Sequence, residues 1–330
     1  MASDDWLTQD WPTSRPEAQG VDPQLVEKVD QYARQPASSG LYSVLVIRNG
    51  SIICERYYGG CGPCDGHQIK SVIKSIFSTL VGIAIREGLI ESLDTPIFQY
   101  LGQYTQFQKR PELKRITIRH VLTMSSGLYW QLGVHAHQPL VTQILHSPDW
   151  TGAVLNLPIQ YAPGTTWVYK EADSMLISAI LRGATGRSAY EFARQYLLAP
   201  LGMESPAWPA DPQGNSHNYL GISPGLALTA RSLAKLGVLF LEEGQWAGNQ
   251  ILDAAYIHDC TRPSFTTNWR EGQYGLMWWV GQGYYAANGW GGQTIAVHPQ
   301  KNLVVVTQAE SETRKSKSYS LIQEIIFPAI

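Results

Sequence analysis

SVIKSIFSTLVGIAIREGL, residues 71–89, is an apolar run that opens with a serine and a lysine. Its apolar side chains would cover nearly the whole circumference of a helix, which predicts a helix buried on all sides. The run turns polar at Arg86–Glu87, and Gly88 stands where a C-terminal cap would end the helix. We therefore expect the rest of the chain to pack around this helix.

The first turn of the predicted helix can support catalysis. Ser71 and Lys74 are three residues apart, so their side chains share one face of the helix. A lysine on an apolar helix is costly unless it is paired or neutral, and desolvation lowers the pKa of its amine. A neutral Lys74 could take the proton of the Ser71 hydroxyl, as in a Ser-Lys nucleophile pair. The four-residue pattern alone is a weak signal, because it recurs at Ser232–Lys235.

Composition narrows the class of protein. The chain has 330 residues, 44% of them hydrophobic and 16% charged, with a net charge of −2. This length allows one large domain or two closely packed lobes. Without a basic surplus, neither nucleic acid nor an anionic membrane is an expected partner. Residues 1–20 lack the apolar segment of a signal peptide, and no run of 18 apolar residues occurs, so we expect a cytoplasmic protein with no membrane partner.

Neither a cofactor nor a metal is expected. Cys61-Gly-Pro-Cys64 matches a thioredoxin redox motif but lacks a helix opening at the first cysteine, and no second ligand pair follows for zinc. We interpret these two cysteines as plain loop thiols. His135 and His137 lack a third metal ligand and are interpreted as surface residues.

Strand patterns lie at both ends of the chain, and helical patterns lie between them. LYSVLVIRNGSIICERYYG, residues 41–59, predicts two strands joined by a turn at Asn49–Gly50. Residues 273–309 return to β-prone segments, whereas residues 90–270 are mostly helical segments broken by Gly and Pro. We expect an α/β fold of the α+β type, in which both chain ends build one antiparallel sheet flanked by helices.

This alternation predicts two lobes within a single domain over residues 1–330. Residues 1–89 and 271–330 would form a sheet lobe, and residues 90–270 a mostly helical lobe inserted into it. Helices are also expected near the termini, at residues 23–35 and 318–327.

Two further motifs accompany the Ser71 helix. PGTTWVYKEADSMLISAIL, residues 163–181, places Tyr169 in a Pro-Gly loop before a helix, and ANGWGGQTIAVHP, residues 287–299, places a Gly-rich turn against a strand. With Ser71-x-x-Lys74, these resemble the three signature elements of the β-lactamase-like serine hydrolases. That superfamily includes class C β-lactamases, D-alanyl-D-alanine carboxypeptidases, family VIII carboxylesterases and 6-aminohexanoate-dimer hydrolases. The resemblance covers roughly residues 18–325 and implies a β-lactamase/transpeptidase-like fold.

The resemblance also implies catalytic roles. Ser71 would be the nucleophile and Lys74 its proton-accepting partner. Tyr169 would share protons with Lys74 and pass one to the leaving group. The backbone N–H groups of Ser71 and Trp290 would form an oxyanion hole, and the N-terminus of a helix at Ser71 suits the negative charge that develops there.

The third motif supplies candidate substrate-binding residues. Asn288 and Gly289 stand where the family's motif ends. Gly289, Gly291 and Gly292 would let a substrate approach the strand edge closely, so we group them with Asn288. Ala287 stands where these enzymes carry a charged residue, which counts against an efficient β-lactamase.

The second motif ends in Glu171, where the family has Asn or Ser. A carboxylate that points at Lys74 would favour the charged amine and weaken it as a base. One that points into the site could bind a cationic substrate group, and one that points outward would pair with Lys170 or solvent. We favour the outward orientation and keep Glu171 among the candidate substrate-binding residues.

The chain contains eleven tryptophans, and several lie in or near these motifs: Trp130, Trp167, Trp278, Trp279 and Trp290. They predict aromatic walls for a cleft, with Trp130 as a candidate substrate-binding residue, although core packing is the alternative. An apolar cleft favours acyl or aryl esters over polar peptides.

Two other serines are set aside. Ser223 lies in Gly221-Ile-Ser-Pro-Gly225, which matches a nucleophile elbow but has no helix beginning just after the serine. Ser232 is expected on the solvent-facing side of a helix.

We therefore expect a serine hydrolase that cleaves small carboxylic esters, with linear amides as a further class, through an acyl-enzyme on Ser71. An amide hydrolase of the 6-aminohexanoate-dimer type and a weak β-lactamase are alternatives. A further alternative is a ligand-binding relative in which Glu171 impairs the Lys74–Tyr169 pair. The expected partner is a small-molecule ester or amide.

Overall fold

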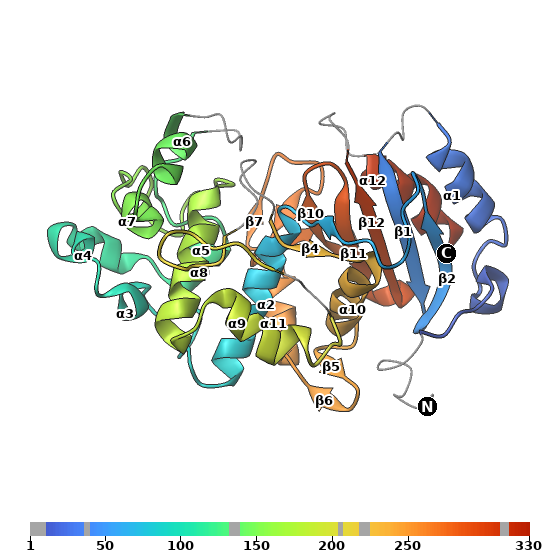
Figure 1. The fold of residues 1–330 in the computed structure, drawn as a ribbon, viewed down its shortest axis with the longest axis horizontal. Helices are drawn as coiled ribbons and strands as arrows, with labels where there is room; N and C mark the ends of the chain where they lie inside the picture. Colours follow the sequence, from blue (N-terminus) through green and yellow to red (C-terminus); the bar gives the residue numbers. More distant parts are fainter. Residues whose placement is uncertain (1–10, 36–39, 132–138, 204–206, 218–224, 311–316) are drawn as a thin grey trace.

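Both ends of the chain meet in one sheet. The computed structural model describes residues 11–35, 40–131, 139–203, 207–217, 225–310 and 317–330. The strands of the sheet are β1 (Leu41–Arg48), β2 (Ser51–Tyr57), β7 (Phe265–Thr266), β8 (Gln273–Tyr274), β9 (Trp279–Val280), β10 (Tyr285–Gly289), β11 (Gln293–His298) and β12 (Leu303–Ala309). All eight pair antiparallel, in the order β2-β1-β12-β11-β10-β9-β8-β7. The predicted sheet built from both termini is confirmed (Figure 1).

The turn between β1 and β2 fixes the start of this sheet. Asn49 and Gly50 have φ values of 49° and 77°, both in the left-handed region. Asn-Gly tolerates two successive positive φ values better than almost any other pair, so this turn matches the twist of the two strands. On its other side β1 pairs with β12, where Leu45 lies opposite Val306. The predicted hairpin at residues 41–59 is confirmed.

Helices joined by loops make up most of the remaining described residues. Their bounds are α1 (Leu25–Ala33), α2 (Val72–Arg86), α3 (Phe98–Leu101), α4 (Gln106–Lys109), α5 (Ile118–Leu122), α6 (Pro139–Leu145), α7 (Trp150–Leu155), α8 (Glu171–Thr185), α9 (Ala189–Ala193), α10 (Ala230–Leu241), α11 (Ala254–Cys260) and α12 (Lys317–Ser320), followed by the C-terminal helical segment η7 (Leu321–Ile326). Among the described residues, two short strand pairs lie outside the main sheet: β3 (His67–Gln68) with β4 (Ala227–Leu228), and β5 (Gln245–Trp246) with β6 (Asn249–Gln250).

The helices form layers on the two faces of the sheet. α1 and η7 pack together on one face, where they enclose a smaller core. α10 and α2 pack on the other face, against β12, β11 and β10, and they belong to the main core. α8 contacts α2, and α3, α5 and α7 in turn contact α8. Figure 1 shows α2 between the sheet and this helical region.

α2 is the buried helix predicted from residues 71–89. Residues 72–84 are all buried, and the helix ends at Arg86, with Glu87 as its C-cap and Gly88 in the left-handed conformation after it. Its buried hydroxyls are satisfied internally: Ser75 Oγ donates to the Met277 carbonyl at 2.7 Å, and Thr79 Oγ1 to the Ser75 carbonyl at 2.8 Å. Ser75 and Thr79 can therefore be buried in this helix because their hydroxyls are hydrogen-bonded.

Some local details differ from the prediction. Residues 273–282 form two short strands, β8 and β9, joined by a turn in which Met277 has a φ of 60°. The lobe boundaries stay a prediction; β7 joins the sheet from residues before 271, and α10 packs on the sheet although it lies within residues 90–270. Within the described part of the chain, no helix has the length and apolarity needed to cross a membrane.

The contact between α10 and the sheet leaves no room for a side chain at Gly237. A Cβ there would lie 2.5 Å from Val304 Cγ1 and 2.9 Å from Ile295 Cγ2. We expect Gly237→Ala to lower the free energy of unfolding by about 1–3 kcal/mol, the usual cost of overpacking, measured by urea denaturation. Gly62→Ala is the control, because the nearest atom to its Cβ is 3.8 Å away. Equal stability of the two variants would contradict this packing.

Candidate active site

The backbone before Ser71 is held in a strained conformation. Lys70 has a φ of 51°, in the left-handed region that side chains rarely adopt. Its side chain is 3% exposed and forms an ion pair with Glu310, just after β12. The Ile69 N–H donates to the Leu226 carbonyl at 3.0 Å. These contacts fix the chain where it enters α2, so that Ser71 occupies the N-terminal position of the helix.

Lys74 lies at the centre of the site. Its Nζ is 3.0 Å from Ser71 Oγ and 2.8 Å from Glu171 Oε1. The side chains of Lys74 and Glu171 are each only 1% exposed. Lys74 Nζ also lies 5.0 Å from the centre of the Tyr169 ring. The structure thus brings Ser71, Lys74 and Tyr169 together as the sequence predicted, and it adds Glu171 to the group.

The charge states of this group follow from their mutual contacts. Burial lowers the pKa of Lys74, but the Glu171 carboxylate and the Tyr169 hydroxyl outweigh it and hold that pKa above the usual lysine value. Burial raises the pKa of Tyr169, and Glu171 adds to this, while Lys74 and a hydrogen bond with Ser71 oppose it. At neutral pH the site therefore holds an ammonium at Lys74 and a neutral phenol at Tyr169.

Glu171 corrects the orientation favoured from the sequence. It is the first residue of α8, its side chain faces Lys74, and the outward orientation is wrong. Its second oxygen accepts a hydrogen bond from Ser174 Oγ at 3.4 Å. Since both carboxylate oxygens face the protein interior, a role in binding a cationic substrate group has no support in this geometry.

A buried polar cluster anchors the segment that carries Tyr169 and Glu171. Lys170 Nζ donates to Ser126 Oγ at 3.1 Å and lies 3.4 Å from Asp173 Oδ2, while Ser126 Oγ donates to Asp173 Oδ1 at 2.6 Å. All three side chains are buried. Sequence reasoning missed this cluster; the only available signal was the three-residue spacing of Lys170 and Asp173.

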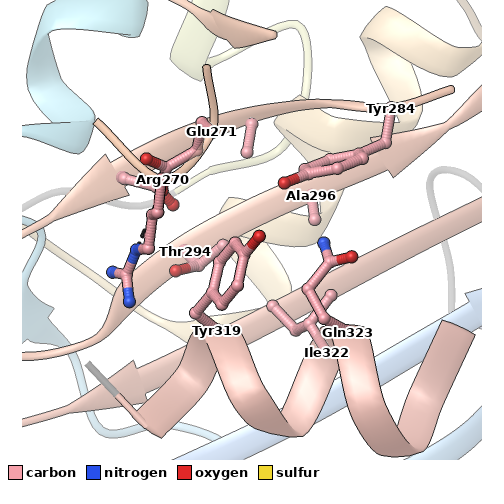
Figure 2. A pocket seen from close by; sticks show the side chains of 10 residues that line it. Arg270, Glu271, Tyr284, Thr294, Ala296, Tyr319, Ile322 and Gln323 are labelled. Atoms are coloured by element: carbon pink, nitrogen blue, oxygen red, sulfur yellow. Dashed lines mark hydrogen bonds and ion pairs between the residues drawn. The ribbon is translucent and has the colours of Figure 1, made fainter. Parts of the chain in front are cut away.

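The side chain of Asn288 points away from α2. Ala287 lies in the main core with α2, so by strand alternation Asn288 faces the other side of β10. There its Nδ2 donates to Glu271 Oε1 at 3.0 Å, in a small pocket between the sheet and η7. Figure 2 shows this pocket, with Glu271 and Arg270 at one end and Tyr319 beneath them. The predicted substrate contact of the Asn288 side chain is therefore corrected.

Close backbone contact or a positive φ explains why the neighbouring residues are glycines. A Cβ at Gly289 would lie 2.5 Å from the Ile69 carbonyl oxygen, so β10 approaches the entry to α2 closely there. Gly291 and Gly292 have φ values of 86° and 113° and form the turn to β11. Trp290, between them and Gly289, is 42% exposed. Substrate contact by these residues and the oxyanion hole at Trp290 stay predictions.

Trp130 is also corrected. It is 3% exposed and packs in the main core, so the core-packing alternative holds and a substrate-binding surface does not. A different aromatic cluster adjoins the site, with Tyr169 as a member. Its rings lie 4.8–6.3 Å apart between centres, and its residues are Trp167, Tyr169, Trp269, Tyr274 and Trp279.

The remaining sequence candidates lie elsewhere or cannot be placed. Ser232 is buried, not solvent-facing: its N–H and hydroxyl pair with Thr229 Oγ1, which caps α10. Cys61 and Cys64 are free thiols, the first partly exposed and the second exposed. His135, His137 and Ser223 lie outside the described residues.

Removing one charge of the Lys170–Asp173 pair should destabilise the folded protein. Asp173→Asn leaves a buried ammonium without its counter-charge, and we expect the free energy of unfolding to fall by about 3–5 kcal/mol. Lys170→Met should have a comparable effect. The double variant removes both charges and should lose less than the sum of the two single losses, as measured by urea denaturation. Additive losses would show that the two side chains do not interact.

Comparison with known proteins identifies the family. The family profile described as Beta-lactamase matches residues 25–321. The 6-aminohexanoate-dimer hydrolase of Paenarthrobacter ureafaciens is 25% identical over 289 residues, which cover 79% of this chain and 70% of that protein. Esterase EstB of Burkholderia gladioli is 28% identical over 191 residues, 53% of this chain and 48% of that protein. 

A solved structure agrees at the level of the fold. EstCE1, described as a hydrolase with promiscuous acyltransferase activity, superposes with a TM-score of 0.72 at 15% sequence identity, covering 94% of this chain and 100% of that one. Because the family profile spans most of the described fold, including the Ser71 helix, the Tyr169 loop and the β10–β11 turn, the chain belongs to the β-lactamase family and is a serine hydrolase of that family.

Proposed function

We propose that this protein hydrolyses small carboxylic esters through an acyl-enzyme on Ser71. The observation that carries the proposal is the hydrogen bond between Ser71 Oγ and Lys74 Nζ at 3.0 Å. The Tyr169 hydroxyl is hydrogen-bonded to both side chains. A nucleophile within hydrogen-bond reach of a base, which is itself oriented by a third group, is the arrangement that covalent catalysis requires.

The three side chains can carry one proton through both halves of the reaction. In acylation, Ser71 Oγ attacks the ester carbonyl carbon, and its proton passes to Lys74 in the amine form. The C–O bond to the alcohol then breaks, Tyr169 gives its proton to the leaving alkoxide, and Lys74 restores the proton of Tyr169. In deacylation, water attacks the acyl carbon and gives a proton to the same pair. Ser71 recovers that proton as the acid leaves.

The surroundings of the site favour esters over β-lactams. Ala287 is buried and uncharged at the position where β-lactam recognition draws on a cation. An alkoxide is a much weaker base than a deprotonated amine and leaves more readily, so an ester depends less on the proton donor than a linear amide does. The names of two relatives, an esterase and a 6-aminohexanoate-dimer hydrolase, support esters and linear amides as the two substrate classes to compare.

Replacement of the nucleophile tests the proposal. We expect Ser71→Ala to abolish hydrolysis of p-nitrophenyl esters while leaving the circular dichroism spectrum unchanged, because a hydroxyl at a helix start contributes little packing. A fluorophosphonate probe should add its mass to Ser71, located by peptide mass spectrometry. Ser232→Ala, the second Ser-x-x-Lys serine, should remain active and labelled. An active Ser71→Ala protein, or a label on another serine, would overturn the proposal.

The aromatic cluster offers a surface for the substrate next to Tyr169. Trp269 lies in the turn between β7 and β8, 5.6 Å from the Tyr169 ring and 5.1 Å from the Trp279 ring between centres. It is 48% exposed, whereas Trp279 is 5% exposed. Exposed tryptophan beside a catalytic group is suited to stack on a flat, apolar part of a substrate.

We therefore expect Trp269→Ala to lower kcat/KM for a p-nitrophenyl ester by about fivefold, chiefly through KM, because one aromatic contact contributes roughly 1 kcal/mol. Ethyl acetate, which has no ring to stack, should be hydrolysed at nearly the original rate. Leu89→Ala removes an exposed apolar side chain beyond the other end of α2 and serves as the control. Equal losses on both substrates would contradict a stacking role.

A further inference from the structure

We propose that Glu171 is a positioning residue that holds Lys74 as an ammonium in the resting enzyme, so that Ser71 becomes reactive only at alkaline pH. The inference rests on the proposed function, in which the amine form of Lys74 takes the proton of Ser71. Glu171 stands where the resembling enzymes carry an uncharged side chain, Asn or Ser.

The hydrogen bonds around Lys74 match those of an ammonium. A protonated lysine has three N–H donors and no lone pair. Lys74 Nζ meets three oxygens: Glu171 Oε1 at 2.8 Å, Ser71 Oγ at 3.0 Å and the Tyr169 hydroxyl. In this state Lys74 donates to Ser71 and has no lone pair with which to accept its proton. The three side chains are in place, but Lys74, the base, already carries a proton.

Burial makes the Lys74–Glu171 pair hard to undo. Both side chains are 1% exposed, so water does not take over the hydrogen bonds of either group if the pair separates. A charge left alone in such a place is strongly disfavoured. Removing the proton from Lys74 leaves Glu171 as a buried anion without its cation, and this cost keeps the proton on Lys74 until the pH is high.

The neighbouring structure holds the backbone at Glu171 in place. Lys170 is fixed to Ser126 and Asp173, and the Val168 N–H donates to the Met124 carbonyl at 2.9 Å. The chain on the N-terminal side of Glu171 is therefore anchored. On its C-terminal side α8 begins at once, and Ser174 Oγ donates to the Glu171 carbonyl at 2.9 Å.

The other titratable groups near Lys74 do not replace this effect. Tyr169 is a neutral phenol, because burial raises its pKa. Burial also raises the pKa of Tyr274, which packs on Tyr169 from β8. Asp173, on the same helix as Glu171, is engaged by Lys170 and Ser126. Glu171 is thus the carboxylate that pairs with Lys74 directly.

The reactivity of Ser71 should rise with pH. Glu171 raises the pKa of Lys74, so the amine form is reached only at high pH and the reactivity of Ser71 should still be rising at about pH 10. In Glu171→Gln the carboxylate is gone while burial remains. The pKa of Lys74 should fall, and the rising limb should move to lower pH.

The test measures the rate of fluorophosphonate labelling of Ser71 from about pH 6 to pH 10, together with kcat/KM for a neutral ester. At about pH 8 we expect Glu171→Gln to react at least tenfold faster than the original protein, which corresponds to one pKa unit or about 1.4 kcal/mol. Glu171→Asp keeps the charge and should keep the alkaline profile. Glu171→Ser, which also removes the charge, carries the test if Glu171→Gln does not fold.

Glu55→Gln is the matched control, because it removes a carboxylate that pairs with Arg231 at 2.8 Å instead of with Lys74. Its pH profile should not move. If Glu171→Gln reacts more slowly than the original protein at every pH, or keeps the same rising limb, the inference is overturned. If no variant is labelled at Ser71, the proposed function itself fails, and the two failures are thereby told apart.

Discussion

The buried ion pair between Lys74 and Glu171 is the interaction on which the site depends. It joins α2 to α8, so it fixes the distance between the Ser71 helix and the segment that carries Tyr169. A buried ion pair is weak evidence for stability, because desolvation offsets much of the attraction. Its importance here is chemical: it decides which protonation state of the lysine the fold presents to Ser71.

The rest of the fold serves to hold that pair in place. The sheet built from both termini gives α2 a wall on one side, and α8 covers it on the other. Glu310, just after β12, pairs with Lys70, the strained residue before Ser71, so the last strand along the chain helps to position Ser71. The close approach of Gly289 to Ile69 adds a contact from β10. Residues far apart in the sequence thus converge at one helix end.

Much of this could be predicted from the sequence, where local physics decides the outcome. The turn follows from the Asn49–Gly50 pair, which tolerates positive φ values, and the buried helix after Ser71 follows from an apolar run. The orientation of Glu171 and the burial of Trp130 could not, because each depends on neighbours supplied by other elements. The position of Asn288 in the motif was clear from the sequence. The face of β10 that its side chain occupies was not, because it depends on strand alternation relative to α2. The Lys170–Asp173 cluster was missed because its partner, Ser126, comes from a distant turn.

The pairing with Glu171 predicts that Lys74 is protonated beside Ser71. Nitrogen NMR on protein labelled with ¹⁵N-lysine observes this charge directly, with the Lys74 signal assigned by its loss in Lys74→Ala. We predict that Lys74 keeps an ammonium chemical shift up to about pH 9 or beyond, since its pKa lies above the usual lysine value. A Lys74 signal that changes to the amine form below about pH 8, with Glu171 in place, would show that Glu171 does not hold the proton on Lys74.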